Sequence, residues 1–131
     1  MYHCGGMEIT SYKSEHEAEV LAAIRKDSGW DVFTSDGSIE NYRQSLQDSI
    51  TYVCYEHDKF CGYIRALLDE GFSVYISELY VLPECRNRNI GRSLLERVKA
   101  DFTGLTVYAL SDEDAYYEKI GYKKIGSVFE L

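Results

Sequence analysis

The sequence predicts an α/β fold, with a central mixed β-sheet flanked by helices. Apolar residues recur along the chain with the period of strands and then of helices, in the order β-αα-βββ-α-β-α-β. The strand–helix–strand unit from Phe72 to Leu110 should be a right-handed crossover between parallel strands. The chain has 131 residues, 45% of them apolar and 27% charged, which is typical of a globular protein. We therefore expect a single domain over residues 1–131.

The first elements follow from local signals. Met7 to Tyr12 is expected to form a strand. Ser14 to Lys26 is expected to form a helix, because Ser14 and Glu17 have the spacing of a capping box. Gly29 is expected to end this helix. A second helix should follow Ser38, where apolar residues repeat every three or four positions.

Three strands are expected next. Ile50 to Tyr55 and Phe60 to Leu68 read as two strands around the turn His57-Asp58-Lys59. Asp69-Glu70-Gly71 is a second turn, and Phe72 to Leu82 is a long third strand. These three segments predict an antiparallel unit.

In the last third of the chain, the apolar residues alternate between the spacing of helices and the spacing of strands. Gly91 to Asp101 is expected to be a helix and Leu105 to Leu110 a strand. A short helix from Asp112 to Lys119 and a final strand from Tyr122 to Leu131 complete the prediction.

The charge balance narrows the classes of partner. The net charge is −8 and the isoelectric point about 4.8. This argues against nucleic acid and anionic membranes as partners, because phosphate binding needs a basic surface. It favours cationic partners such as amines. The alternative is that the acidity only keeps the protein soluble.

No apolar run approaches the ~20 residues of a membrane span, and no secretory signal is visible. A cytoplasmic location is therefore expected.

The cysteines predict no metal site. They lie at positions 4, 54, 61 and 85, without a Cys-x-x-Cys spacing or a nearby histidine pair. In a reducing cytosol they should be free thiols, and Cys54 and Cys61 are placed to face each other across the turn. Cys85 is interpreted as a small apolar filler, with a reactive thiol as the alternative.

The most informative segment joins the long strand to the following helix. The strand stops at Pro83, and Arg86, Arg88 and Arg92 follow as the helix begins. A helix start presents unpaired N–H groups and partial positive charge, which suit a phosphate. The N–H groups of Asn87 to Arg92 are expected to surround a diphosphate, and Gly91 is expected to permit close approach. The alternative is a surface arginine cluster with an ordinary glycine at the helix start.

Two blocks in this region resemble the GNAT superfamily of acetyl-CoA-dependent N-acetyltransferases. The segment Leu79-Tyr80-Val81-x-Pro83-x-x-Arg86-x-x-Asn89-x-Gly91 is similar to the family's Gln/Arg-x-x-Gly-x-Gly/Ala loop. Arg86 matches the first position and Gly91 the last, whereas Asn89 replaces the usual middle glycine. Asparagine tolerates left-handed backbone angles best among the non-glycine residues. The second block, Ala115-Tyr116-Tyr117-Glu118-Lys119-Ile120-Gly121-Tyr122, is similar to the family's Phe-Tyr-Glu-x-x-Gly-Phe block.

The resemblance implies how acetyl-CoA, the co-substrate, would bind. Two parallel strands should splay, so that pantetheine bonds to the backbone of the long strand, with a bulge near Tyr80 or Val81. An N–H group near Val81 would polarise the thioester carbonyl. The expected coenzyme-binding residues are Leu79, Tyr80, Val81, Arg86, Asn87, Arg88, Asn89, Ile90, Gly91 and Arg92.

The resemblance also implies catalytic roles. The expected reaction is direct attack by a primary amine on acetyl-CoA. Tyr117 matches the acid that protonates the departing thiolate, with a packing aromatic as the alternative, and Tyr116 would then face the core or the other side of the helix. Glu78 is the best candidate for the base, with a structural carboxylate or ordered water as alternatives. Leu110 stands where many relatives have an asparagine, and Ser111 is a candidate replacement.

The acceptor amine is not defined by the sequence. We expect its pocket to be built from the helical region Trp30 to Leu46 and the end of the Phe72–Leu82 strand. The candidate residues are Trp30, Phe33 and Tyr42 as lining groups and Asp31 and Asp36 as ammonium partners. A homodimer is compatible with the sequence. Two other classes stay open: a non-catalytic acyl-CoA-binding or regulatory protein on the same fold, and an interaction domain without a ligand.

Overall fold

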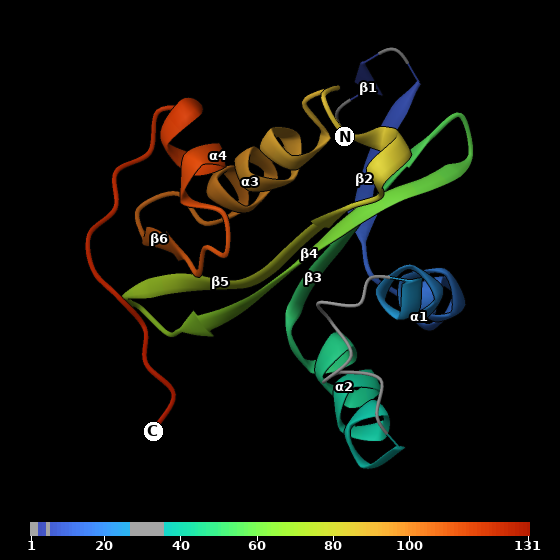
Figure 1. The fold of residues 1–131 in the computed structure, drawn as a ribbon, viewed down its shortest axis with the longest axis horizontal. Coiled ribbons are helices and arrows are strands. Elements are labelled where there is room, and N and C mark those ends of the chain that lie inside the picture. The colour runs from blue at the N-terminus through green and yellow to red at the C-terminus, as the bar shows by residue number, and fades with distance from the viewer. Residues whose placement is uncertain (1–2, 5, 27–35) are drawn as a thin grey trace.

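The computed structural model describes residues 3–4, 6–26 and 36–131 and contains one mixed sheet with the strand order β1-β2-β3-β4-β5-β6 (Figure 1). The strands are β1 His3–Cys4, β2 Met7–Ser11, β3 Ile50–Glu56, β4 Lys59–Asp69, β5 Ser73–Val81 and β6 Thr106–Ala109. The helical elements are η1 Ser14–His16, α1 Glu17–Lys26, α2 Asp36–Asp48, η3 Pro83–Cys85, α3 Ile90–Asp101 and α4 Asp114–Lys119. Neighbouring strands from β1 to β5 are antiparallel, and β6 is parallel to β5.

Helices cover both faces of the sheet, which confirms the predicted fold class. Helices α1 and α2 lie on one face, and α3 and α4 lie on the other (Figure 1). The core is accordingly divided into two clusters. Val20, Ile24 and Tyr63 belong to the cluster on the α1–α2 face, and Ile76 and Leu94 belong to the cluster on the α3–α4 face.

Most element bounds agree with the sequence-based prediction to within a few residues. The turn between β3 and β4 has left-handed backbone angles at His57 (φ 52°) and Asp58 (φ 64°), as expected for a tight hairpin. The predicted end of the first helix at Gly29 lies outside the described residues. Strand β1 was not predicted; its two residues are too few to show a period.

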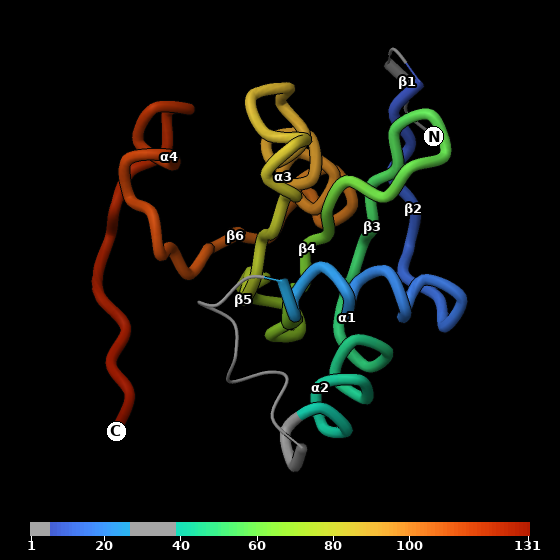
Figure 2. Tube along the Cα trace, turned by 45° about the vertical axis from the view of Figure 1, so that its right-hand side comes forward, coloured from blue at the N-terminus to red at the C-terminus, as the bar shows by residue number. Residues whose placement is uncertain are grey.

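The predicted final strand from Tyr122 to Leu131 is wrong, because this segment contains no regular secondary structure. The segment runs outside β6 in both views (Figures 1 and 2). Its first residues are held at the helical layer, where Lys124 pairs with Asp114 at 3.3 Å and Tyr122 donates to Glu96 at 3.3 Å. A strand pattern in the side chains does not suffice when the backbone lacks a partner strand.

Cys54 of β3, Cys61 of β4 and Cys85 of η3 belong to the same buried cluster, on the α3–α4 face of the sheet. Burial raises the pKa of both Cys54 and Cys61 to about 12. Cys85 is 1% exposed, as a small apolar filler would be. Cys54, Cys61 and Cys85 are free thiols.

Strands β5 and β6 separate after a short parallel ladder. Their register runs from Ser73 opposite Thr106 to Ile76 opposite Ala109. The last hydrogen bond runs from the N–H of Leu110 to the carbonyl of Ile76, at 2.9 Å. Strand β5 then continues to Val81 paired with β4 but no longer with β6, so the predicted splay of the parallel strands is confirmed.

A bulge marks the place where β5 leaves β6. On the β4 side, Arg65 lies opposite Glu78 and Ala66 lies opposite Ile76, so Ser77 is the extra residue. The predicted bulge near Tyr80 or Val81 is therefore wrong by a few residues. Bulges bend a strand, and this one bends β5 directly after its last bond to β6.

No helix within the described ranges is long and apolar enough to cross a membrane.

Candidate active site

The open stretch of β5 presents backbone amides to the gap between β5 and β6, which we call the fork. The N–H of Leu82 donates to the carbonyl of Cys61 at 2.9 Å, so Leu82 faces β4. Because backbone groups alternate along a strand, those of Val81 and Leu79 face the fork. The carbonyl of Tyr80 instead lies close above Gly62 of β4. The fork therefore has the backbone pattern that an extended amide-rich ligand would bind.

The loop between β5 and α3 turns on two asparagines. Asn87 and Asn89 have left-handed backbone angles, with φ of 65° and 63°. The expectation that Asn89 adopts this conformation in place of glycine is confirmed. The carbonyl of Asn89 accepts bonds from the N–H and hydroxyl of Ser93, at 2.9 and 2.8 Å. The loop therefore delivers the chain into α3 with its first N–H groups, those of Ile90 to Arg92, beyond the reach of intrahelical acceptors.

The three loop arginines have different surroundings. Arg88 forms an ion pair with Glu56 at 2.7 Å, and the Nε of Arg86 donates to the carbonyl of Val81 at 2.9 Å. Arg92 is exposed and has no ion pair or hydrogen bond to another described residue. Among the described residues, Arg92 is therefore the loop arginine whose charge is not engaged by a carboxylate or a carbonyl, a difference that the sequence alone did not reveal.

Gly91 is buried, and its empty side points into the protein. A Cβ atom at this position would lie 2.5 Å from Oη of Tyr116 and 3.7 Å from Cδ2 of Leu79. The missing side chain therefore leaves room for Tyr116, and the expected close approach of a diphosphate to Gly91 stays a prediction.

The two tyrosines of α4 point in different directions. Tyr116 packs against α3, in agreement with the expectation that it faces the core. Tyr117 lines a cavity of about 980 Å³ between β6, α3 and the C-terminal segment. Burial, with a smaller contribution from the neighbouring Tyr116, raises the pKa of Tyr117 to about 12. Tyr117 is therefore a protonated hydrogen-bond donor at neutral pH.

Glu78 lies at the centre of a buried polar network on the α1–α2 face of β5. Its side chain is 4% exposed and pairs with Arg65, whose side chain is 12% exposed. The Nε of Arg65 donates to Oε2 of Glu78 at 2.8 Å, and the hydroxyl of Ser77 donates to the same oxygen at 2.9 Å. Tyr42 donates to Oε1 of Glu78. The carboxylate is thus enclosed and bonded on both oxygens.

A second phenol extends this network. The hydroxyl oxygens of Tyr42 and Tyr63 lie 2.7 Å apart. Each phenol carries one proton, so Tyr42, which donates to Glu78, accepts from Tyr63. Burial raises the pKa of Tyr42, and the charge of Glu78 raises it further. These two phenols remain protonated and stabilise the carboxylate.

The sequence reasoning found Glu78 but missed Arg65. The available signal was a single cation within the apolar run of β4, from Phe60 to Leu68. A charge on a buried strand requires a partner, and Glu78 is the acidic residue on the neighbouring strand. Gly62 was also missed; it lies where β4 passes under the carbonyl of Tyr80.

The expected acceptor residues are only partly tested. Trp30, Asp31 and Phe33 lie outside the described residues, as does the side chain of Asp36. Tyr42 is 5% exposed and belongs to the Glu78 network, so its side chain is enclosed by the part of the chain that the structure describes. Next to the fork, the hydroxyl of Ser111 accepts the N–H of Glu113 at 3.1 Å.

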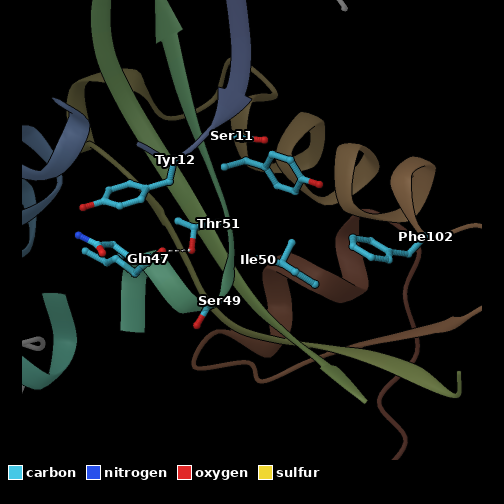
Figure 3. A pocket seen from close by; sticks show the side chains of 9 residues that line it. Ser11, Tyr12, Gln47, Ser49, Ile50, Thr51 and Phe102 are labelled. Carbon is cyan, nitrogen blue, oxygen red and sulfur yellow. Dashed lines mark hydrogen bonds between the residues drawn. The ribbon is translucent and has the colours of Figure 1, made fainter. Parts of the chain in front are cut away.

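A smaller cavity lies away from the fork (Figure 3). It measures about 250 Å³ and lies between the ends of β2 and β3, the end of α2 and Phe102. None of the predicted site residues lines it. The nearby hydroxyl of Tyr12 is buried without a hydrogen-bond partner among the described residues. Within the same ranges, no group of three histidine, cysteine or acidic side chains is arranged to hold a metal ion.

Comparison with solved structures shows the same fold in several acetyltransferases. A GNAT-family acetyltransferase from Streptococcus pneumoniae TIGR4 is 23% identical, with a TM-score of 0.71 over 95% of this chain and 98% of the other. A GCN5-related N-acetyltransferase from Ralstonia eutropha JMP134 is 20% identical, with a TM-score of 0.74 over 96% and 98%. The aminoglycoside N-acetyltransferase AAC(6')-Iy, solved with CoA, is 18% identical, with a TM-score of 0.72 over 100% and 97%.

The sequence comparisons assign the family. A search of curated protein sequences gave no significant match. The family profile described as an acetyltransferase (GNAT) domain matches residues 12–131, which is nearly the whole chain. With the β5–β6 fork and the loop at the start of α3, this match shows that the chain belongs to the GNAT acetyltransferase family.

Proposed function

We propose that this protein transfers the acetyl group of acetyl-CoA to a primary amine by direct attack in a ternary complex. The observation that carries the proposal is the fork, where Leu79 and Val81 present backbone amides beside the start of α3. This juxtaposition fits a donor that has an amide-rich arm and a diphosphate.

The loop residues would bind the diphosphate. The N–H groups from Asn87 to Arg92 are the donors, and Arg92 adds a full charge. Arg86 holds the carbonyl of Val81 in this structure, so the arriving pantetheine competes with Arg86 for that carbonyl. Before the coenzyme binds, Arg86 and Arg88 thus stabilise the loop through their present contacts. Once it is bound, they add positive charge beside the diphosphate.

The chemistry requires one bond to form and one to break. The amine nitrogen attacks the thioester carbon, forming the C–N bond, and the C–S bond breaks. The N–H of Val81 is the donor proposed for the developing oxyanion. Tyr117 donates a hydrogen bond to the leaving sulfur. A thiol has an ordinary pKa near 8.5, well below that of Tyr117, so Tyr117 does not give its own proton to the thiolate. The proton that the sulfur finally carries comes from solution.

The amine must lose a proton before or during attack. The enclosure of Glu78 by Arg65, Ser77 and Tyr42 favours a route through ordered water over direct transfer to this carboxylate. Glu78 then acts as a positioning residue that fixes the bulge of β5 beside the reacting centre.

The acceptor is proposed to be a cationic amine: a small amine, a lysine or an N-terminal amine. The net charge of −8 favours such acceptors. One structural neighbour, AAC(6')-Iy, was solved with a bisubstrate analogue made of CoA and monomethyl-acetylneamine. This likeness supports an amine acceptor and does not select one.

The test is thiol release from acetyl-CoA across a panel of polyamines, amino acids, aminoglycosides and peptides. We expect amine-dependent release that falls in Tyr117→Phe and persists in Tyr116→Phe. Calorimetric binding of acetyl-CoA without release on any amine would support the non-catalytic alternative. Absence of binding would overturn the proposal.

A further inference from the structure

We propose that a row of apolar and aromatic side chains beside the fork binds the body of the acceptor, and that this acceptor is a primary amine carrying a flat aromatic ring on an alkyl arm. The row consists of Leu67, Tyr75, Tyr108 and Leu110, and we call it the ring platform. The inference rests on the proposed function and names the class of acceptor for that same site.

The strand register places these side chains next to one another. Leu67 of β4 lies opposite Tyr75 of β5, and Tyr75 lies opposite Tyr108 of β6. Directly opposed residues point to the same face of a sheet and are close enough to form one surface. Leu110 follows Tyr108 by two positions, and its N–H still bonds to β5, so its side chain joins the same face.

The ring platform faces away from the helices that carry the coenzyme loop and Tyr117. Val74 and Ile76, which flank Tyr75, belong to the core cluster on the α3–α4 face. Val107 precedes Tyr108 and packs against the same cluster. Because side chains alternate along a strand, both platform tyrosines point to the α1–α2 face. Since the coenzyme would enter the fork from the α3 side, this is the face from which an amine can approach the thioester.

The ring platform is not part of the protein's core. None of its four residues belongs to either hydrophobic cluster of the described residues. Leu67 is 47% exposed and Leu110 is 43% exposed, and both tyrosines are half-buried. Helices α1 and α2 lie toward β2 and β3 on this face, away from β6 (Figure 1). An exposed apolar patch of this kind marks a binding site more often than a scattered surface residue does.

The ring platform adjoins the reacting centre. Its two tyrosines and Leu110 line the cavity of about 980 Å³ that Tyr117 also lines. Leu110 lies at the closed end of the fork, where its N–H forms the last bond to β5. Pantetheine that runs along β5 from the start of α3 would direct its thioester toward this end. A ring lying on the platform can therefore extend an amine into the fork.

The chemistry of the platform favours a ring over a polycation. Aromatic pairs gain free energy beyond the burial of their area. The hydroxyls of Tyr75 and Tyr108 have no hydrogen bond to another described residue, so they can bond to a polar group on the ring. None of the four side chains is charged, and the nearby Glu78 is already paired with Arg65. The next carboxylate along β4, that of Asp69, lies on the side away from the fork. Several ammonium groups would therefore lack carboxylate partners here.

The first experiment measures thiol release from acetyl-CoA with matched amines. Phenethylamine and phenylbutylamine carry the ring on arms of different length, butylamine lacks the ring, and spermidine carries several charges. We expect kcat/KM for the better ring-bearing amine to exceed that for butylamine about tenfold or more. Spermidine should be a poorer substrate than the ring-bearing amine. A preference for butylamine or spermidine would overturn the proposal.

Paired variants locate the selectivity. Tyr75→Leu with Tyr108→Leu removes both rings but keeps apolar side chains. It should raise the KM for the ring-bearing amine about tenfold and leave the KM for butylamine and for acetyl-CoA nearly unchanged. Tyr75→Phe with Tyr108→Phe keeps both rings and should retain the wild-type KM for phenethylamine. Phe72→Leu is the matched control, because Phe72 is an exposed aromatic outside the platform. A KM shift in this control as large as in the leucine pair would contradict the assignment.

A binding measurement without turnover separates this inference from the proposed function. Saturation-transfer NMR with excess CoA detects bound phenethylamine whether or not acetyl transfer occurs. We expect a signal in wild type and in the phenylalanine pair, and its loss in the leucine pair. A signal without thiol release from any amine would refute acetyl transfer and support the platform. Thiol release with no phenethylamine signal in wild type, or with the same signal in a folded leucine pair, would overturn the platform and leave acetyl transfer standing. If circular dichroism shows that the leucine pair does not fold, the wild-type ranking of the amines decides.

Discussion

The hydroxyl of Tyr116 lies directly over Gly91, in the space that a side chain at position 91 would fill. The Cβ that glycine lacks would be 2.5 Å from Oη of Tyr116, whereas the ring carbon behind it would be 3.4 Å away. This contact joins α4 to the first turn of α3. It therefore links the helix that carries Tyr117 to the helix start proposed to bind the diphosphate.

The contact predicts a pair of substitutions that compensate each other. Gly91→Ala should lower the free energy of unfolding by about 1–3 kcal/mol, because overpacking displaces Tyr116. In a Tyr116→Phe background the new methyl group meets only ring carbon at an ordinary distance. There Gly91→Ala should be neutral or stabilising, because alanine favours a helix over glycine by about 1 kcal/mol.

Urea unfolding of the two single variants and the double variant measures this coupling. Gly126 is a control position, because nothing lies within 4 Å of its missing Cβ and its φ is not positive. Equal effects of Gly91→Ala in both backgrounds would show that Tyr116 does not fill this space.

The Arg65–Glu78 pair predicts that Glu78 contributes mainly to stability. Glu78→Gln leaves a buried guanidinium without its charge partner, and breaking such a pair costs about 3–5 kcal/mol. Replacing both residues with apolar ones, as in Arg65→Met with Glu78→Leu, should cost much less. Urea unfolding and kcat are to be measured together. Unchanged stability with a collapse of kcat in Glu78→Gln would instead identify Glu78 as the base.

The sequence predicted the parts of this protein that depend on local pattern. The helix over α3, the β3–β4 turn and the left-handed Asn89 follow from side-chain period and backbone preference. The segment 122–131 has an equally clear period but forms no strand here. Strand formation needs a paired backbone, which local pattern does not specify.

The backbone features of the candidate site could be predicted from the sequence. The partners of its side chains could not. The fork and the loop were expected from the order of the elements. The direction of Gly91 and the engagement of Arg88 by Glu56 depend on contacts between distant residues. The Arg65–Glu78 pair is another such contact, since it joins two strands across the bulge.

The loop arginines should contribute unequally to coenzyme binding. Arg92→Ala removes the cation without a carboxylate partner among the described residues. It should weaken acetyl-CoA binding about ten- to a hundredfold, since a charge-assisted bond contributes about 1.5–3 kcal/mol. Arg88→Ala should have a smaller effect on affinity, because Arg88 already pairs with Glu56. Calorimetry at low and high salt compares the acetyl-CoA affinities of the two variants. A larger loss of affinity in Arg88→Ala than in Arg92→Ala would contradict the prediction.

Asn89 should be replaceable by glycine but not by a branched residue. At φ 63° glycine pays no steric cost, whereas other residues pay about 1–2 kcal/mol. We therefore expect Asn89→Gly to keep stability and acetyl-CoA affinity, and Asn89→Val to lower both. Thermal unfolding with and without acetyl-CoA measures the two effects. Loss of affinity in Asn89→Gly would show that the amide side chain itself takes part in binding.

The raised pKa of Tyr117 sets the pH range over which its hydroxyl stays protonated and can donate a hydrogen bond. With a pKa of about 12, caused first by burial, it stays protonated where an ordinary tyrosine, with a pKa of 10.0, would ionise. Folding therefore favours the neutral phenol. The stability contributed is complete below pH 10 and is lost as the pH rises toward 12, because the unfolded chain releases this proton first.

Tyr117→Phe tests the same property in catalysis. Loss of the donor should lower kcat by about 10²-fold, within the range for removing one hydrogen bond to a developing charge, with little change in the KM for acetyl-CoA. The ratio of wild-type to variant kcat should stay constant from pH 7 to above pH 10, since the phenol does not ionise in this range. Tyr116→Phe, whose hydroxyl faces Gly91, should leave kcat nearly unchanged. If the ratio halved near pH 10, the Tyr117 hydroxyl would have to be solvated, and burial could not be what keeps this donor protonated.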